Sequence, residues 1–421
     1  MKASLDDLAI FGGPSTFAES LCVGRPNIGR REDFLARVKD MLDRRWLTND
    51  GPYVREFEQV LERNLGVAHC VAVANATVGL GLVARALGLT GEVILPAFTF
   101  AATAHALQWH GIEPVFADSD PQTHNLDPAH AERLITSRTT GILGVHVWGR
   151  PCAVEELTAL ARRRNLTLLF DAGHAFACSH KGRMIGNFGR AEVFSFHATK
   201  FVHSFEGGAI ATNDPALAAL LKRTRNFGFG GYDEVTDLGI NAKMSEAAAA
   251  MGLTMQESLH EIVKVNKEHY EIYRSRLGQV PGLQVIDFAP HESANYQYVV
   301  VEIDEAAAGL SRNALHKTLW AEGVLARRYF YPGCHRMEPY RSLPRYRGIR
   351  LPVTDTARRP SPLPSHGHRG DHGRRRNGLL AHRVLSSPWT GASMRIRAIE
   401  PVPCARRGSV RRDESSQRAR T

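Results

Sequence analysis

A lysine, Lys200, stands among small and apolar residues in the segment FSFHATKFVHSFEGGA, residues 194–209. The apolar run before it predicts a strand that ends near Phe196, so Lys200 falls in a loop at the end of that strand. An isolated lysine is most often a solvated surface charge. A partly desolvated lysine instead has a lowered pKa and acts as an amine nucleophile, which is the reactivity that Schiff-base formation with an aldehyde needs.

A carboxylate and an imidazole follow a second apolar strand, in the segment LTLLFDAGHAFACSHKG, residues 166–182. Asp171 ends the strand, where it could cap the following turn or pair with a protonated pyridine nitrogen. His174, three residues on, could reach the phenolic oxygen of the same ring. A zinc site of His174, Cys178 and His180 is disfavoured, because no second ligand pair follows at a suitable spacing.

A candidate phosphate site lies in CVAVANATVGLGLVARALG, residues 70–88, where a strand is followed by a helix. The backbone N–H groups and the hydroxyl of Ala76 and Thr77 would stand at the helix N-terminus, which attracts phosphate. An ordinary helix cap is the alternative. Gly79 and Gly81 give only a weak dinucleotide-binding signal, because no third glycine completes the motif and both lie inside the helix.

An aromatic side chain, Phe100, follows another strand end in LPAFTFAATAHAL, residues 95–107. Most aromatic residues at such a position belong to the core. Either Phe100 or the neighbouring Phe98 could instead stack on a flat cofactor ring.

Alternating strands and helices must position these residues. Short, nearly all-apolar strands separated by amphipathic helices predict a parallel sheet covered on both faces, with its chemistry at the carboxyl ends of the strands. The strands are HCVAVAN, EVILP, EPVFA, GILGVHV and LTLLFD, followed by EVFSF and GGAIATN without a long helix between those two. The helices between the first five are expected near 77–88, 100–110, 128–135 and 153–164.

The flanking segments divide the chain further. An irregular arm is expected over residues 1–30, and two helices over 31–45 and up to about residue 65. A long helical stretch at 244–278 precedes QVIDF, YQYVVVEID, a helix near 311–322 and VLARRYF, which suggest a smaller α+β domain. The expected division is therefore an arm at 1–30, a large domain at 31–260, a small C-terminal domain at 261–355 and a tail at 356–421.

Charge is distributed unevenly along the 421 residues, whose formal net charge is +10. Of the 53 basic and 43 acidic residues, 15 arginines and four acidic residues lie in the tail at 356–421. The remaining 38 basic and 39 acidic residues leave the body with a net charge of −1. A positive field of the whole body that would attract nucleic acid is therefore not expected.

The tail differs from the rest of the chain in composition. It is rich in Arg, Pro, Gly, Ser and His, and its one short apolar run lies near 379–385. Low hydrophobicity with a large charge predicts disorder, and a basic arm for RNA or an anionic membrane surface is an alternative. Arginine without lysine is also what a GC-rich gene read out of frame gives, and our hypothesis is that the native frame is lost near residue 355.

Several features point to a cytoplasmic protein without a membrane partner. No apolar run approaches the roughly 18 residues of a membrane helix, and the start MKASLDDLAIFGG lacks the pattern of a secretory signal. The cysteines are scattered and form no CxxC pair, which suits a reducing compartment and argues against a zinc ribbon. They lie at positions 22, 70, 152, 178, 334 and 404.

Taken together, the motifs resemble the DegT/DnrJ/StrS family of sugar aminotransferases, over about residues 20–355. They occur in family order: WLTNDGPYVREFE, NATVGL, PAFTFAATAHAL, DAGHAF, FSFHATKFVHSFEGGA and RNFGF…GINAKMSE. The resemblance implies the α/β fold of type I pyridoxal-phosphate-dependent transferases. In that fold a large domain holds a mostly parallel seven-stranded sheet, and a smaller C-terminal α+β domain follows.

The resemblance also implies a role for each candidate residue. Lys200 would form the Schiff base with pyridoxal 5'-phosphate, and no metal is expected. The other cofactor-binding residues would be Asp171 at the pyridine nitrogen, His174 at the ring hydroxyl, Phe100 stacked on the ring, and Ala76, Thr77 and Ser195 at the phosphate. Asn241 resembles the asparagine that reaches the phosphate of the neighbouring subunit, which implies a homodimer with shared active sites. His335 resembles a histidine on the substrate side.

The expected reaction is transamination from an amino acid, L-glutamate, to a keto-sugar nucleotide. The pair FHATK and FEGG is typical of members that aminate C4, which favours dTDP-4-keto-6-deoxyglucose as the acceptor. Relatives that dehydrate sugars carry His at the lysine position, and Lys200 argues against them. The chain lacks the strand and final helix that family members carry after LPVTD, at 351–355. The alternative is therefore an inactive or truncated paralogue that binds the cofactor or a partner without turnover.

Overall fold

A seven-stranded sheet forms the centre of the molecule. A computed structural model of the chain describes residue 2 and residues 4–356. The strand order is β2-β10-β9-β6-β5-β3-β4. The strands are β2 (His69–Val73), β3 (Glu92–Pro96), β4 (Glu113–Ala117), β5 (Thr139–Val145), β6 (Thr167–Asp171), β9 (Glu192–Ser195) and β10 (Gly208–Thr212).

All seven strands coincide with the runs expected from the sequence. The pairs β3–β4, β3–β5, β5–β6 and β6–β9 are parallel, whereas β10 is antiparallel to both of its neighbours, β2 and β9. The predicted fold class, α/β with a mostly parallel seven-stranded sheet, is therefore confirmed. Because β10 runs against the rest, its first residue lies at the same edge of the sheet as the last residues of β2 and β9.

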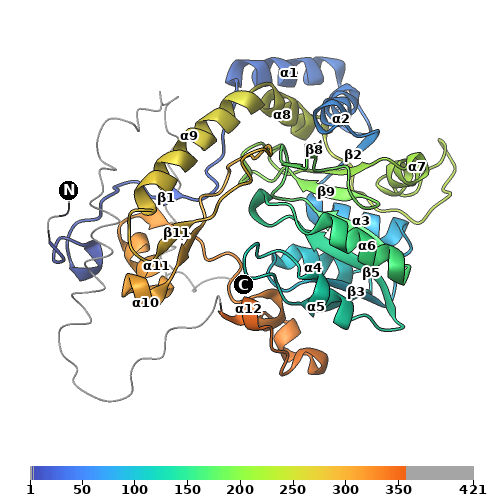
Figure 1. Cartoon of the computed structure of the whole chain (residues 1–421). Helices are drawn as coiled ribbons and strands as arrows, with labels where there is room; N and C mark the ends of the chain where they lie inside the picture. The colour runs from blue at the N-terminus through green and yellow to red at the C-terminus, as the bar shows by residue number, and fades with distance from the viewer. Residues whose placement is uncertain (1, 3, 357–421) are drawn as a thin grey trace, which may run out of the picture.

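Helices cover both faces of this sheet (Figure 1). One face packs against α3 (Ala76–Ala86), α4 (Ala101–Gln108) and α7 (Pro215–Thr224). The other packs against α2 (Pro52–Leu65), α5 (Pro128–Arg133), α6 (Val154–Arg164) and α8 (Glu246–Glu257), with α1 (Arg31–Arg44) lying on α8. Alternate side chains of one strand pack against the two helix layers. Val71 and Val73 of β2 face α3, and Cys70 and Ala72 face α2.

Helix α2 shows how local sequence sets these elements. Pro52 occupies the first helical position, where its missing N–H costs nothing, and Gly66 ends the helix in the left-handed conformation at φ 62°. The fully buried side chains recur at helical spacing and pack on the sheet and α8; they are Val54, Phe57, Leu61 and Leu65. Each such burial stabilises the fold by roughly 1.5–3 kcal/mol.

The second half of the chain builds a smaller body at the end of a long helix. The helical stretch expected at 244–278 is two helices, because the chain turns at Ser258 between α8 and α9 (Leu259–Leu277). Helix α9 leads away from the sheet to the small body, at the left of Figure 1. That body contains β11 (Leu283–Val285), β12 (Val301–Ile303), α10 (Glu305–Ala308), α11 (Arg312–Ala321) and β13 (Val324–Leu325).

The N-terminal arm is more ordered than the sequence suggested. It forms a short 3-10 helix, η1 (Ala9–Phe11), and a strand, β1 (Leu21–Cys22), that pairs in parallel with β13. Glu322, at the end of α11, has a fully buried carboxylate that accepts hydrogen bonds from the backbone N–H of Ala9 and from Thr16. The arm therefore belongs to the core of the small body.

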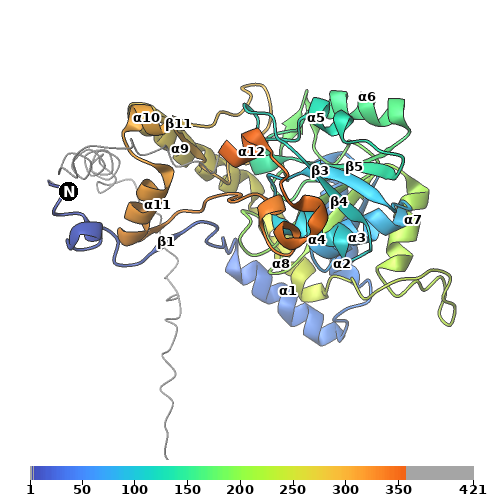
Figure 2. The ribbon, with the colours of Figure 1, turned by 90° about the horizontal axis from the view of Figure 1, so that it is seen from below.

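Residues 334–351, which the sequence analysis placed in the small domain, pack instead on the large sheet. The side chains of Tyr340 and Tyr346 join the core between α4 and β4, and the Tyr346 hydroxyl donates to the carbonyl of Pro114 at 2.7 Å. This segment is seen beside β4 and α4 in Figure 2 and ends in α12 (Pro352–Thr356). The interpretation of the tail as out of frame concerns residues beyond these and lies outside the described part of the chain.

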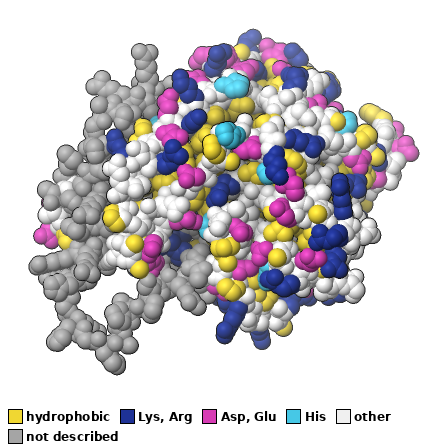
Figure 3. All heavy atoms as spheres, viewed as in Figure 1, with side chains coloured by type: hydrophobic (Ala, Val, Ile, Leu, Met, Phe, Trp, Pro, Cys, Tyr) yellow, Lys and Arg dark blue, Asp and Glu magenta, His cyan; other side chains and the backbone are white. Residues whose placement is uncertain are grey.

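Two surface properties bear on function. Within residue 2 and residues 4–356, no helix is both long and apolar enough to cross a membrane. On the face shown in Figure 3, acidic and basic side chains are interspersed over the body. That mixture agrees with the net charge of −1 counted for residues 1–355.

Candidate active site

The candidate residues meet at one edge of the large sheet, where its parallel strands end. Asp171 is the last residue of β6 and Ser195 the last of β9. Ala76 begins α3 three residues after β2 ends, and Phe100 precedes α4 in the loop after β3. Lys200 lies between β9 and β10, in a loop whose two ends are both fixed at this edge. The strand directions therefore bring these residues to one edge of the sheet.

Asp171 is held by two donors from different elements. One carboxylate oxygen, Oδ2, accepts a hydrogen bond from the hydroxyl of Thr103 in α4 at 2.8 Å. The other, Oδ1, accepts from the backbone N–H of Gly173 at 3.0 Å. Sequence reasoning missed Thr103, because a threonine inside FAATAHAL looks like any other residue of a helix. Its only sequence signal is its place in the first turn of the helix that follows a strand.

Lys200 has the altered amine that the sequence suggested. Its backbone N–H closes a turn on the carbonyl of His197 at 2.8 Å. Burial lowers the pKa of its ammonium group from 10.5 to about 8, although the negative charge of Asp171 acts in the opposite direction. At this pKa roughly a tenth of the amine is neutral at pH 7. The charge of Asp171 acts on the ammonium group of Lys200, so the two side chains lie near each other.

His174 is neutral and oriented. Burial, and then the positive charge of Lys200, hold its pKa well below the usual range. Its Nδ1 accepts the backbone N–H of Trp148 at 3.2 Å, so the proton of the neutral ring is on Nε2, which can donate a hydrogen bond. The ring stacks on Phe330, with centroids 5.8 Å apart and planes 11° apart, and meets Tyr298 edge-on.

A backbone cradle stands at the start of α3. Asn75 caps this helix through a 2.9 Å bond from the N–H of Val78 to its side-chain oxygen. No acceptor in the described chain bonds the N–H groups of Ala76 and Thr77. A Cβ at Gly208 would lie 2.7 Å from the nitrogen of Ala76, and Gly208 pairs with Ser195 across the sheet. The glycine therefore lets the Ser195 strand and the helix N-terminus approach closely enough to share one anion.

Three further candidates have different surroundings. Phe100, the N-cap residue of α4, has 61% of its side chain exposed. Asn241 is exposed, and within the described residues its side chain makes no hydrogen bond. His335 is almost fully buried, and its Nε2 lies 3.2 Å from Oδ1 of Asp355. Its contact with a substrate stays a prediction, because its observed partner belongs to α12.

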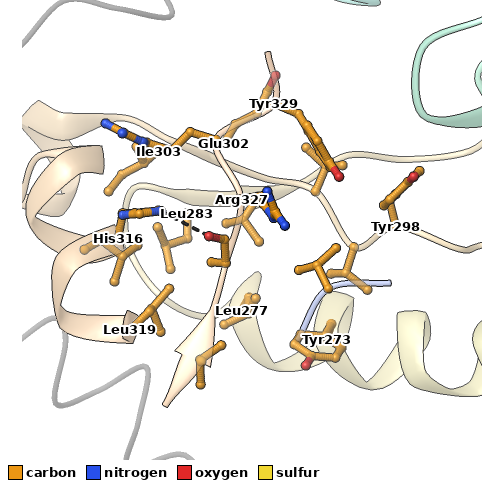
Figure 4. A pocket seen from close by; sticks show the side chains of 18 of the residues that line it. Tyr273, Leu277, Leu283, Tyr298, Glu302, Ile303, His316, Leu319, Arg327 and Tyr329 are labelled. Atoms are coloured by element: carbon orange, nitrogen blue, oxygen red, sulfur yellow. Dashed lines mark hydrogen bonds between the residues drawn. The ribbon is translucent and has the colours of Figure 1, made fainter. Parts of the chain in front are cut away.

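A cavity of about 1170 Å³ opens next to Tyr298 and Trp148, both of which contact His174. Aromatic side chains from the large body, Phe98 and Trp148, line one part of it. The small body lines the rest, and Figure 4 shows Tyr298, Tyr329, Arg327 and the apolar residues behind them facing this space. The volume suits a ligand larger than an amino acid, since common ligand sites measure about 300–1,000 Å³.

These parts fit a phosphorylated pyridine aldehyde. The amine of Lys200 fits its aldehyde, the anchored carboxylate of Asp171 its ring nitrogen, and the N–H groups with Ser195 its phosphate. The zinc alternative is not supported, because His180 pairs with Glu155 and His174 with Trp148. Nor do three potential metal ligands gather anywhere in residue 2 and 4–356. Fold and site together define the class of pyridoxal-phosphate-dependent transferases of fold type I.

Comparisons with known proteins specify the class further. The model of the DegT/DnrJ/EryC1/StrS aminotransferase family matches residues 29–370. The dTDP-4-amino-4,6-dideoxy-D-glucose transaminase of Escherichia coli is 33% identical over 341 residues, which cover 80% of this chain and 91% of that protein. The GDP-perosamine synthase of Caulobacter vibrioides is 33% identical over 332 residues, which cover 77% and 87%. The chain therefore belongs to the DegT/DnrJ/EryC1/StrS aminotransferase family.

Solved structures agree with this assignment. The structure of DesI, determined in the presence of its TDP-sugar product, is 48% identical and has a TM-score of 0.81, covering 91% of this chain and 97% of that one. The structure of NtdA from Bacillus subtilis, with bound cofactor PMP, is 25% identical with a TM-score of 0.71. The predicted family, the enzyme class and the cofactor, pyridoxal phosphate, are confirmed. The intact site favours an enzyme over the inactive paralogue.

Proposed function

We propose that this enzyme transfers an amino group from L-glutamate to C4 of dTDP-4-keto-6-deoxyglucose. The names of the E. coli transaminase and of the DesI complex support the TDP-sugar class. The observation that carries the proposal is the group of Lys200, Asp171 and His174 at one sheet edge, with the lysine pKa lowered to about 8. A lysine that exchanges protons near neutral pH can serve both halves of a transamination.

Each residue has a distinct task in this proposal. Bound pyridoxal phosphate supplies an electron-withdrawing ring on which the amino group is carried. Lys200 anchors the cofactor and then, as a free amine, moves a proton at the α-carbon of the amino donor and later at C4 of the sugar. Asp171 keeps a proton on the pyridine nitrogen by its negative charge. His174 donates its Nε2–H toward the ring hydroxyl, and Phe100 covers the ring.

The phosphate group would be bound by backbone and hydroxyl donors. The N–H groups of Ala76 and Thr77 point outward from the positive end of α3, and the hydroxyl of Ser195 stands across Gly208 from them. No lysine or arginine is required, because two oriented N–H groups and the helix dipole already favour an anion.

We further infer that the enzyme is a homodimer with shared sites. Residues 226–241, here called the apolar hairpin, join Asn226 to Asn241 and Phe229 to Val235 by β-bridges. The hairpin exposes Phe227, Tyr232, Leu238 and Ile240, the tyrosine by 98%. Such a set of exposed apolar side chains is typical of an interface. Asn241, at the base of the hairpin, would reach the phosphate of the second copy, and His335 would lie on the substrate side.

We place the enzyme in the cytoplasm. The support is chemical: the five cysteines in the described residues are free, which suits a reducing compartment, and nucleotide sugars and glutamate are soluble metabolites.

The test is amine transfer with purified full-length protein. Glutamate and dTDP-4-keto-6-deoxyglucose should give the 4-amino sugar nucleotide by mass spectrometry, and the Lys200→Ala variant should give none. A matched assay with a GDP-linked 4-keto sugar tests the nucleotide. Turnover by Lys200→Ala equal to that of the unchanged enzyme would reject the proposal.

A further inference from the structure

Two buried threonines stand behind the carboxylate of Asp171. Thr103 is fully buried, and its hydroxyl lies 2.8 Å from Asp171 Oδ2. Thr99 is also buried, and its hydroxyl lies 2.8 Å from that of Thr103. The family resemblance assigned neither residue a role. Thr103 lies in the first turn of α4, and Thr99 directly precedes the N-cap Phe100, so the two hydroxyls meet at the edge of the sheet.

The hydrogen atoms in this chain can be assigned. A carboxylate only accepts, so Thr103 must donate its single hydroxyl proton to Asp171. The bond between the two threonines can then form only if Thr99 donates to Thr103. The result is a directed chain from Thr99 through Thr103 to Asp171, in which each bond polarises the next.

The chain restrains a torsion that is otherwise soft. The carboxyl group of an aspartate turns easily about its last bond, because that torsion has broad minima. Here Thr103 holds one oxygen and the Gly173 N–H holds the other, each from a different element. The plane of the carboxylate is therefore fixed before any ligand arrives. Such preorganisation is most important where a carboxylate must approach a charged ligand atom from one direction.

We propose that Thr103 is the positioning residue for Asp171 and that Thr99 holds Thr103 in place. Together they aim the carboxylate at the protonated ring nitrogen of the cofactor. The inference rests on the proposed role of Asp171. The competing explanation is purely structural, in which the threonines only fasten α4 to β6.

Binding of pyridoxamine 5'-phosphate to the apoenzyme separates the two explanations, because this form is not linked to Lys200. Thr103→Val keeps the shape but removes the donor, and it should weaken binding by about ten- to a hundredfold, as expected for a lost hydrogen bond to a charged group. Thr103→Ser retains the hydroxyl and should restore most of the affinity. Thr99→Val should have a smaller effect in the same direction.

A ring analogue supplies the control. The 1-deaza analogue of pyridoxamine phosphate has carbon in place of the ring nitrogen, so Thr103→Val should not weaken its binding. Equal weakening of both ligands, or unchanged binding of pyridoxamine phosphate, would overturn the proposal. Asp171→Asn tests the underlying role: if it too leaves the affinity unchanged, the assignment of Asp171 fails, and not only that of Thr103. If Thr103→Val does not fold, the binding of the same two ligands to Thr99→Val provides the test.

Discussion

At the scale of single residues, the amine of Lys200 sets the working pH in the proposed reaction. Burial among apolar neighbours disfavours its charged form, and Asp171 recovers only part of that loss. The neutral amine is therefore available about 2.5 pH units below that of a solvated lysine. Burial also keeps His174 neutral. The site therefore holds an imidazole N–H donor and an amine that can gain or lose a proton near neutral pH.

The pH dependence of cofactor attachment tests this balance. Only the neutral amine attacks the aldehyde, so the rate of pyridoxal-phosphate attachment to the apoenzyme should rise with pH and level off above about 8. In Asp171→Asn the favourable negative charge is lost, and the midpoint should move lower. Stopped-flow measurement of the protein-bound visible absorbance gives both curves. A midpoint of the rate curve near pH 10.5 would contradict the lowered pKa of Lys200.

Sequence reasoning found the residues that carry charge and missed those that orient them. Lys200, Asp171 and His174 each follow an apolar strand, and a polar residue at that point is conspicuous. Thr103 is not, because its role depends on a contact with residue 171, 68 positions away, which no local pattern encodes. The neighbour of His335 was also beyond prediction, since Asp355 reaches it through the fold of residues 334–355.

At the scale of elements, the reversed strand β10 determines the site. It returns the chain to the same edge at which β9 ends, so the loop with Lys200 is tied at both ends. The glycines of FEGG serve this return: a Cβ at Gly208 would lie 2.7 Å from the nitrogen of Ala76 and 2.9 Å from the carbonyl oxygen of Phe194. The strands were predictable from their apolar runs, whereas the direction of β10 was not.

Gly208→Ala should therefore separate the cradle from the sheet. Backbone atoms surround the added methyl group and cannot move independently, so we expect a loss of about 1–3 kcal/mol in unfolding free energy and weaker binding of inorganic phosphate. Gly231→Ala is the control, because its Cβ meets neighbours only at 3.5 Å or more. Urea unfolding and phosphate titration measure the two effects. Equal results for both variants would show that the close approach is unimportant.

The apolar hairpin provides a test of assembly. Leu238 is 72% exposed near its base, and Leu238→Asp should turn the homodimer into a monomer and reduce cofactor affinity by removing Asn241 of the second copy. Ile272→Asp is the control, since Ile272 is 40% exposed on α9, the helix that leads away from the large sheet (Figure 1). Sedimentation analysis of both variants measures whether each is a dimer or a monomer. A dimer that survives Leu238→Asp would exclude the hairpin from the interface.

At the scale of the whole molecule, the first and last parts of the chain close the structure. The arm completes the small body through the β1–β13 pair and Glu322, and residues 334–351 return to the large sheet. Neither link was predictable, because both join segments hundreds of residues apart with no shared pattern. The change in rhythm predicted a large domain at 31–260 and a smaller α+β domain at 261–355, but residues 334–351 depart from this division by packing on the large sheet.

Glu322 is the polar anchor of the arm. Burial alone would raise its pKa, but hydrogen bonds from Thr16 and Ala9 lower it below the ordinary value. Its stabilisation is therefore present above the usual carboxyl pKa and is lost as the pH falls through the lowered one. Glu322→Gln should cost about 1–3 kcal/mol at pH 7 and progressively less in acid.

Limited proteolysis of the arm and unfolding at several pH values measure this loss. Glu305→Gln, on the neighbouring α10, is a matched control with a carboxylate that is not buried. A penalty for Glu322→Gln that does not change between pH 7 and pH 3 would contradict the role of its charge.

The cavity next to Tyr298 and Trp148 draws its walls from several separate stretches of the chain, most of which lie outside the large sheet. The groups proposed to act on protons and phosphate stand at the edge of the sheet, whereas much of the cavity wall comes from residues 283–329. Mutations in that later stretch can remodel the shape offered to an acceptor while the reacting groups stay unaltered. Related enzymes can thus acquire new acceptor substrates through mutations in the stretch that corresponds to residues 283–329.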